Sequence, residues 1–507
     1  MSDIASGFPK NLAYNLKKLD AGFSKTKVKI FPDNTTSQQN GIIRFRITGN
    51  GLYDFRSLCM YMTGSCTGTS VDSADLHLPR YSSSLIENIS ITANNTTLCS
   101  INAYNLLYNT LMDVEGSDIS QMTKRNASGE RYDPSTYYTI TENDAKNQAI
   151  ACVNNLKIAT NHDTDVPLCI NNWVGFLGSL STSVIDLADI GDLYINIQFA
   201  PVEVCWVSNS ATANTSGRTT NPAYSLRDIF MTIDRCSFQD PLYYNLKTEK
   251  LLSPEGLNVA FYDYFYYQGS SKAKSNTPSL NFNVNSASLD QVITTFRPKD
   301  YQTIYPLVLA SGNLDGDVGK TFTQILAGDP TTSVNTGSST AGDWNIAYSQ
   351  GGYTGDATNQ GNVGDLFNQS WYFCRSGASL TGSKFQINSV DIDPYALTKL
   401  EVFNKVLQYT GFQNIDLGTS GLHPGILSVH HFAKYYFIDI CDLTNISGDN
   451  QMWISGLDGR GGGINVIYTP TFNSANSQEV FPVAWCRSTR VLRINAGRQL
   501  TLDPPSM

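Results

Sequence analysis

Short segments with alternating hydrophobic residues recur along the chain, and this repetition constrains the fold more than any other sequence feature. Ile43, Phe45 and Ile47 fall on one face of an extended chain, while Arg44 and Arg46 fall on the other. A period of two residues predicts β-strands that bury one face, as in antiparallel sandwiches. The same pattern occurs in residues 84–92, 192–201, 225–234, 257–261, 282–284, 464–468, 480–485 and 490–495. The chain is therefore predicted to be all-β.

Helices are predicted at three places, each in a connection between strands. The first covers residues 100–114, where leucines and tyrosines repeat at helical spacing. The second covers 240–252, and the third starts at 393 and ends before 411. The second and third both begin with Asp-Pro, and a glycine follows the third. Asp as N-cap, Pro at the first helical position and Gly beyond the end are typical helix boundaries.

The strands fall into two blocks of similar length. Residues 30–238 form the first block and 257–507 the second, with a linker containing a short helix over 239–256. Each block has room for eight strands and long loops, which is the size of a jelly roll. Residues 1–29 are predicted to form a basic N-terminal arm. Residues 311–370, rich in Gly, Ser, Thr, Asn and Asp, are predicted to be a long exposed loop and the first target of a protease.

The composition excludes several classes of protein. Charged residues make up 16% and aromatic residues 11% of the chain. A disordered chain or a charged helical array would have more charge and fewer aromatic residues. The ten cysteines contain no CxxC pair, and several lie in apolar runs, so we expect reduced core thiols and a cytosolic folding environment. We find no secretory signal and no apolar run of about 20 residues that would predict a transmembrane helix.

Three stretches of the chain, taken together and in order, resemble a known family. They are residues 78–113, a strand pair followed by a Tyr-Asn-Leu-Leu helix; residues 178–201, a polar turn and a regular strand; and residues 228–268 with 288–301, a strand, a linker and the next strands. This series resembles the double jelly-roll major capsid proteins of virophages and related double-stranded DNA viruses, and within that family the Sputnik-type virophage members. The resemblance covers nearly the whole chain, although each motif by itself is loose.

The resemblance implies an all-β fold of two tandem jelly-roll barrels with a few short helices in the connections. It also implies a structural subunit of the virion, assembled in the host cytoplasm or a viral factory. Three chains would form a pseudo-hexameric capsomer of an icosahedral shell, beside a separate penton (vertex) protein and minor capsid proteins. The family carries no catalytic residues to transfer, so we predict no catalytic, cofactor-binding or metal-binding residues and no enzyme activity.

Two glycine-rich segments match the sequence motifs of nucleotide-binding loops in part. Gly319-Lys320-Thr321 ends a stretch that follows an apolar strand, but a phosphate loop requires glycine at position 314, where this chain has leucine. Gly459–Gly463 precedes a strand, whereas a dinucleotide loop precedes a helix whose N-terminus holds the pyrophosphate. We interpret the first as a surface loop and the second as a hairpin connection.

Metal binding is not favoured either. His430 and His431 are neighbours in a predicted strand, so they point to opposite faces and cannot chelate one ion as a pair. Asp186, Asp189 and Asp192 cluster in one predicted turn. A solvated turn is the plain interpretation of this cluster, and a structural divalent ion is the alternative.

The charge of the chain is unevenly distributed. Its net charge is −9, yet residues 1–29 carry +4 and the last 27 residues carry +3. In a shell protein, basic ends that face inward would contact packaged DNA or an inner membrane non-specifically. The plain alternative is a pair of solvated tails.

Two other functions compete with the capsid hypothesis. A carbohydrate-binding or lectin-like β-sandwich would also be all-β, but it is expected to carry an aromatic binding face, paired carboxylates and a secretion signal. A nucleotide-dependent protein would rest on Lys320 and fails on the glycine spacing. The lectin-like protein is therefore the main alternative.

Overall fold

The computed structural model describes most of the strands and the helices that connect them. The described residues are 23–34, 39–71, 76–79, 81–115, 165–207, 218–238, 241–254, 256–299, 301–302, 371–409, 432–433, 436–444, 456–474, 476 and 478–502. The loop predicted at 311–370 lies outside them.

The first unit consists of two main antiparallel sheets. One sheet has the order β1-β11-β3-β7, with β8 also paired to β3, and the other has the order β2-β9-β5-β6. Their strands are β1 (Phe23–Ile30), β2 (Ile42–Ile47), β3 (Leu52–Val71), β5 (Ile86–Ala93), β6 (Thr96–Ile101), β7 (Val166–Ile170), β8 (Val184–Asp186), β9 (Leu193–Phe199) and β11 (Arg218–Phe238). A small pair, β4 (Leu76–His77) and β10 (Trp206–Val207), completes the unit.

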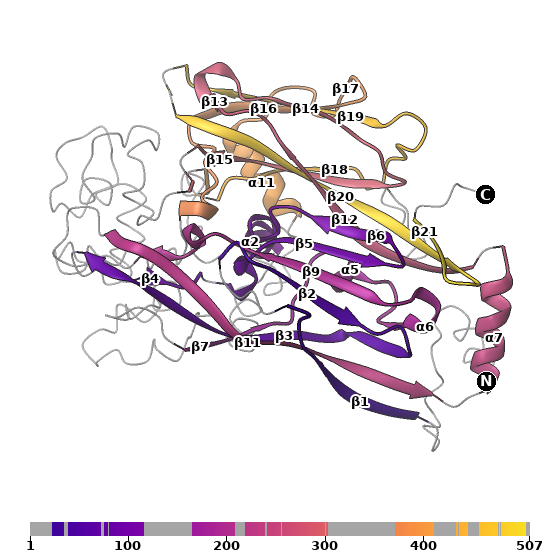
Figure 1. Cartoon of the computed structure of the whole chain (residues 1–507). Helices are drawn as coiled ribbons and strands as arrows, with labels where there is room; N and C mark the ends of the chain where they lie inside the picture. The colour runs from indigo at the N-terminus through magenta and orange to yellow at the C-terminus, as the bar shows by residue number, and fades with distance from the viewer. Residues whose placement is uncertain are drawn as a thin grey trace, which may run out of the picture.

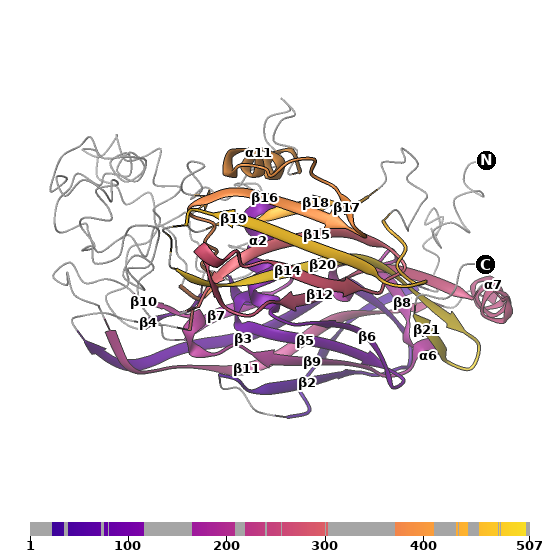
Figure 2. The ribbon, with the colours of Figure 1, turned by 90° about the horizontal axis from the view of Figure 1, so that it is seen from above.

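The second unit repeats this plan. One sheet has the order β12-β20-β15-β18, with β13 and β21 also paired to β20, and the other has the order β14-β19-β16-β17. Their strands are β12 (Leu257–Gln268), β13 (Lys272–Ala273), β14 (Leu280–Val284), β15 (Leu289–Pro298), β16 (Leu380–Ile387), β17 (Val390–Asp391), β18 (Asp439–Asp442), β19 (Ile464–Phe472), β20 (Glu479–Asn495) and β21 (Gln499–Leu502). Figures 1 and 2 show the two units side by side, the first in indigo to magenta and the second in rose to yellow.

The alternation seen in the sequence is confirmed by the burial of side chains. In β2, Ile43, Phe45 and Ile47 are buried while Arg44 and Arg46 are exposed. The apolar positions of β9 and β19 are buried in the same alternating way. The buried faces of all four main sheets belong to one hydrophobic core, which continues from one unit into the other.

Strand β15 corrects the expectation that each strand buries only one face. All ten of its residues are buried, including polar ones. On the face away from the sheet β14-β19-β16-β17, Arg297 lies over the rings of Tyr301 and Tyr372, and Gln291 accepts a hydrogen bond from Tyr409. Other parts of the chain therefore cover the face that an isolated sandwich would leave in water.

The three predicted helices exist, with corrected starts for two of them. Helix α7 (Pro241–Leu252) follows Asp240 as predicted. Helix α2 spans Tyr104–Glu115 and so begins later than residue 100. Helix α11 spans Lys399–Tyr409 and does not begin at Asp393-Pro394. Asp393 instead accepts a hydrogen bond from the backbone N–H of Phe385, six residues before the helix begins.

The proposed arm over residues 1–29 needs a correction at its end. Its last seven residues belong to β1, which pairs antiparallel with β11 from Phe23↔Phe238 to Ile30↔Met231. Lys25 of this strand forms ion pairs with Asp54 and Asp234, each at 3.0 Å. The alternation of lysines with threonine, valine and isoleucine in this segment makes it an outer strand of the first unit.

Candidate functional site: the junction between the two units

Many of the buried polar side chains of the described chain lie where the two units meet. Residues 371–376, which include the short helix η8 (Trp371–Phe373), contribute to this junction from the second unit. Helix α2 and strands β5 and β6 contribute to it from the first unit. The contacts among these elements decide how one barrel is oriented on the other.

Arg375 and Asp113 form the central ion pair of the junction. Their side chains are 0% and 1% exposed, and the guanidinium also donates from Nη1 to Thr110 Oγ1 at 2.9 Å. Asp113 and Thr110 lie on α2, while Arg375 forms a β-bridge with Tyr436 in the second unit. A charge withdrawn this far from water is tolerated only when it is paired, so each of these two side chains requires the other to stay buried.

Glu87 of β5 receives a second set of contacts across the junction. Its Oε2 atom accepts hydrogen bonds from Asn105 Nδ2 and from the hydroxyl of Tyr372, both at 2.7 Å. Burial raises the pKa of Tyr372 far above its ordinary value, so the phenol stays protonated and remains a donor.

Asp263 of β12 joins the units a third time. Its Oδ1 accepts from the Cys99 thiol of β6 at 3.1 Å, and its Oδ2 accepts from Arg490 Nη1 at 3.0 Å. Burial, with the Asp263 carboxylate, raises the pKa of Cys99 well above its usual value. The thiol therefore acts as a weak donor and not as a nucleophile.

The free edge of β12 is covered by the first unit. Strand β12 ends its sheet, so its outer backbone groups have no strand partner there. Ser181 accepts from the N–H of Ala260 through Oγ at 2.9 Å and donates its own N–H to the Ala260 carbonyl at 2.8 Å. Ser179 Oγ accepts from Tyr262 N at 2.8 Å. These bonds satisfy an edge that would otherwise be open to pairing with another chain.

The aspartate cluster of the sequence is occupied by basic side chains. Lys247 of α7 pairs with Asp186 at 2.7 Å and with Asp189 at 2.9 Å. Asp192 pairs with Arg46 and accepts from the N–H of Gly49. The plain interpretation, a solvated turn, was incomplete, because Asp186 and Asp189 hold the linker helix α7 on the first unit and Asp192 ties β2 to the start of β9.

Of the other sequence motifs, the structure describes one glycine-rich segment. Gly459–Gly463 forms a turn that leads into β19, as expected for a hairpin connection. Gly319-Lys320-Thr321, His430 and His431 lie outside the described residues. No group of three or more His, Cys, Asp or Glu side chains in the described ranges could hold a metal ion. The nine cysteines that the structure describes are free thiols.

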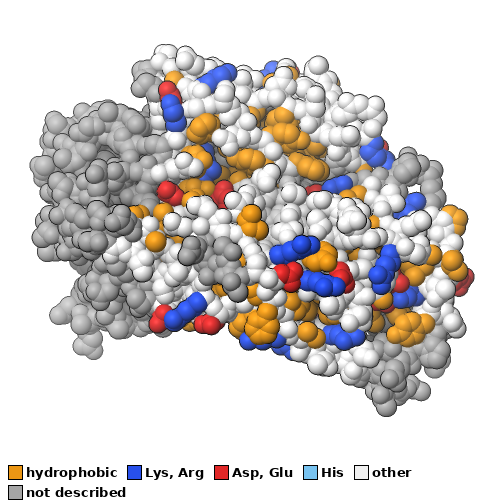
Figure 3. Space-filling model, in the orientation of Figure 1, with side chains coloured by type: hydrophobic (Ala, Val, Ile, Leu, Met, Phe, Trp, Pro, Cys, Tyr) orange, Lys and Arg blue, Asp and Glu red, His pale blue; other side chains and the backbone are white. Residues whose placement is uncertain are grey.

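Charge on the visible surface is mixed. Figure 3 shows lysine and arginine side chains in small groups with aspartate and glutamate nearby. Arg44 lies over the ring of Tyr194 at 3.9 Å, and Lys29 over that of Phe230 at 3.5 Å. Several cations of β1 and β2 are thus engaged by carboxylates or rings of the same chain.

Sequence reasoning missed the residues of the junction. Arg375 and Asp113 are 262 residues apart, and neither lies in a recognisable motif. The start of α11, in contrast, had a readable signal. Thr398 and Glu401 form a capping box, in which Glu401 Oε2 accepts from Thr398 N at 2.7 Å. The Thr-x-x-Glu spacing predicts this start better than Asp393-Pro394 does.

Comparison with known proteins identifies the fold. No protein-family model and no curated protein sequence matches the chain. Among solved structures, the chain is similar to PBCV-1 VP54 as fitted into a reconstruction of the virophage Sputnik, with a TM-score of 0.53 and 12% identity over 98% of this chain and 100% of that chain. A quasi-atomic model of the PBCV-1 virus capsid gives a TM-score of 0.54 and 10% identity, over 98% of this chain and 100% of that chain.

The structure of the Sputnik virophage gives a TM-score of 0.52 at 10% identity, over 96% of this chain and 90% of that chain. Together these likenesses confirm the predicted fold class, which is two tandem jelly rolls with a few short helices in the connections. The described part of the chain contains no helix long and apolar enough to cross a membrane.

Proposed function

We propose that this chain is a major capsid protein, a structural and non-catalytic subunit of a virion shell. The observation that carries the proposal is the likeness to capsid structures of PBCV-1 and Sputnik along nearly the whole length of both chains. The junction supports it, since one buried ion pair, Arg375–Asp113, and the hydrogen bonds of Tyr372 and Cys99 join the two barrels into one block. A shell subunit needs such a block, because its contacts on both sides must meet neighbours at constant angles.

In this proposal, three copies form a homotrimeric capsomer with six barrels in a pseudo-hexagonal ring, and capsomers tile an icosahedral shell. Apolar side chains exposed on the monomer support self-association. On α7 these are Tyr244, Leu246 and Leu252, and near β17 and α11 they are Val390, Ile392, Tyr395 and Leu400. Leu252 is 71% exposed and Val390 62%. Patches of this kind commonly mark protein contacts.

Further partners follow from the same proposal. Neighbouring capsomers, a penton protein and minor capsid proteins would contact the rim of the trimer. The basic ends would meet DNA or an inner membrane through charge alone. The protein would reside in the virion after assembly in the host cytoplasm or a viral factory.

Light scattering coupled to size exclusion tests the proposal on the purified chain. We expect a species of three times the chain mass of 55.7 kDa, with a hexagonal outline in electron micrographs. A monodisperse monomer at micromolar concentration would contradict it and favour the lectin-like alternative, which glycan-array binding would then test.

A further inference from the structure

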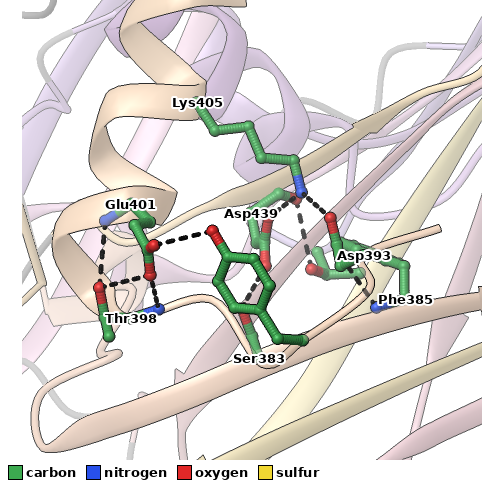
Figure 4. Close-up of polar contacts among 9 residues, drawn as sticks. Ser383, Phe385, Asp393, Thr398, Glu401, Lys405 and Asp439 are labelled. Atoms are coloured by element: carbon green, nitrogen blue, oxygen red, sulfur yellow. Dashed lines mark hydrogen bonds and ion pairs between the residues drawn. The ribbon is translucent and has the colours of Figure 1, made fainter. Parts of the chain in front are cut away.

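One lysine of the second unit faces two buried carboxyl groups. Lys405 of α11 places its Nζ atom 3.1 Å from Oδ1 of Asp439 and 3.7 Å from Oδ1 of Asp393. The Asp439 side chain is 0% exposed and that of Asp393 11%. Figure 4 shows the lysine reaching from α11 to the two carboxyl groups on the strands and turn beneath it. We propose that Lys405 and Asp439 condense into an intramolecular isopeptide bond.

The reaction balances without a co-reactant. The amine of Lys405 attacks Cγ of Asp439, a C–N bond forms, one C–O bond breaks, and the oxygen leaves as water. The ammonium first gives up a proton, and the departing hydroxyl gains one. Asp393 Oδ1 lies 3.7 Å from the nitrogen, so a proton relay through this carboxyl requires a closer approach or one bridging water. The net change is one ammonium and one carboxylate converted into one amide and one water.

The burial of Asp439 lowers the cost of forming the acid that the attack requires. Burial raises the pKa of Asp439 above its ordinary value. Burial by itself would lower the pKa of Lys405, but the carboxylates of Asp439 and Asp393 raise it. The resting state is therefore an ion pair. Transfer of its proton removes two charges from a site with little water, which gives the neutral amine and acid.

Neighbouring groups supply the other needs of the reaction. Ser383 Oγ donates to Asp439 Oδ2 at 2.8 Å, and this donor would stabilise the charge that develops on that oxygen during the attack. The ring of Phe385 lies 5.0 Å from the lysine nitrogen and helps to exclude water. Effective concentrations in well-oriented intramolecular reactions reach about 10⁵–10⁸ M, and gains of this kind would oppose the unfavourable condensation of an amine with an acid in water.

The bond would close a covalent loop between α11 and β18, whose linked residues are 34 positions apart. Helix α11, now held on the second unit by packing, by the ion pairs of Lys405 and by the hydrogen bonds of Tyr409, would become covalently attached to it. This inference does not depend on the capsid proposal, because it concerns chemistry within one chain.

The chain offers a matched control. Lys247 also faces two carboxylates at closer distances, 2.7 Å from Asp186 and 2.9 Å from Asp189. Both of those carboxylates keep part of their surface in water, at 10% and 16% exposure. Distance and the exposure of the lysine, 12% for Lys247 against 25% for Lys405, favour the Lys247 site, whereas full burial of the Asp439 carboxyl favours Lys405.

Intact-mass spectrometry of the denatured full-length chain tests the inference. We expect a mass lower than that of the sequence by one water, about 18 Da. Acylated Lys405 resists trypsin, so the digest should contain a branched peptide that joins residues 400–434 to 435–460. Lys405→Arg keeps the positive charge, cannot form the amide and should restore the full mass. Lys247→Arg should leave the deficit unchanged, and Asp393→Asn should slow its appearance.

Two results would overturn the inference. One is a full-mass chain that trypsin cleaves after Lys405 even after days of incubation in the folded state, which would make the cluster an ordinary ion pair. The other is a water loss that persists in Lys405→Arg. Because the first result is read on the unaltered chain, the test holds even if a variant fails to fold.

Discussion

Replacing Arg375 with methionine should destabilise the chain by about 3–5 kcal/mol, because the Asp113 carboxylate would stay buried without the guanidinium. Methionine fills much of the volume of the arginine stem, so the loss should reflect charge more than packing. The hydrogen bond to Thr110 disappears as well and contributes about 1 kcal/mol. Replacing both partners, Arg375→Met with Asp113→Leu, should recover most of the stability, since no buried charge then remains.

Guanidinium chloride unfolding, followed by tryptophan fluorescence at one protein concentration, measures these differences. Arg227→Met is the matched control, because Arg227 pairs with Asp165 on the surface at 58% and 65% exposure. It should change the free energy of unfolding by less than about 1 kcal/mol. The reasoning fails if Arg375→Met costs no more than this control, or if the double variant is as unstable as the single one.

Two further predictions concern single positions. Cys59, half-buried on β3, should react with iodoacetamide before the buried cysteines, because the hydrogen bond with Cys169 lowers the pKa of Cys59 to about 6. Since the thiolate reacts, its alkylation rate should rise up to about pH 6 and then level off, and a rate that still climbs tenfold between pH 7 and 8 would contradict the lowered pKa. Gly178→Ala should lower stability by about 1–3 kcal/mol, because its Cβ would lie 1.7 Å from the carbonyl oxygen of Trp173. An alanine variant with an unchanged unfolding midpoint would show that α5 (Phe176–Ser179) can shift at no cost.

The strands of this protein could be predicted from the sequence because their signal is local. In β2 and β9 successive side chains point to opposite faces of the sheet. Burial of one face therefore requires hydrophobic and polar residues to alternate along the strand. Helix α7 was likewise readable from Asp240-Pro241. The start of α11 was misplaced because Asp393, a good N-cap by type, bonds to the backbone of β16.

Side-chain partners across the units depend on the tertiary structure alone. Arg375 meets Asp113 across 262 residues, and Lys405 meets Asp439 across a gap of 34. No periodic pattern in the sequence marks either pair, because a charge is tolerated in the core only after distant elements have packed and excluded water around it. The burial of strand β15 likewise depends on tertiary structure, since its second face is covered by segments that are distant in the sequence. Local periodicity determined which residues form strands, and the packing of the two units decided which polar groups lose their water and must bind one another.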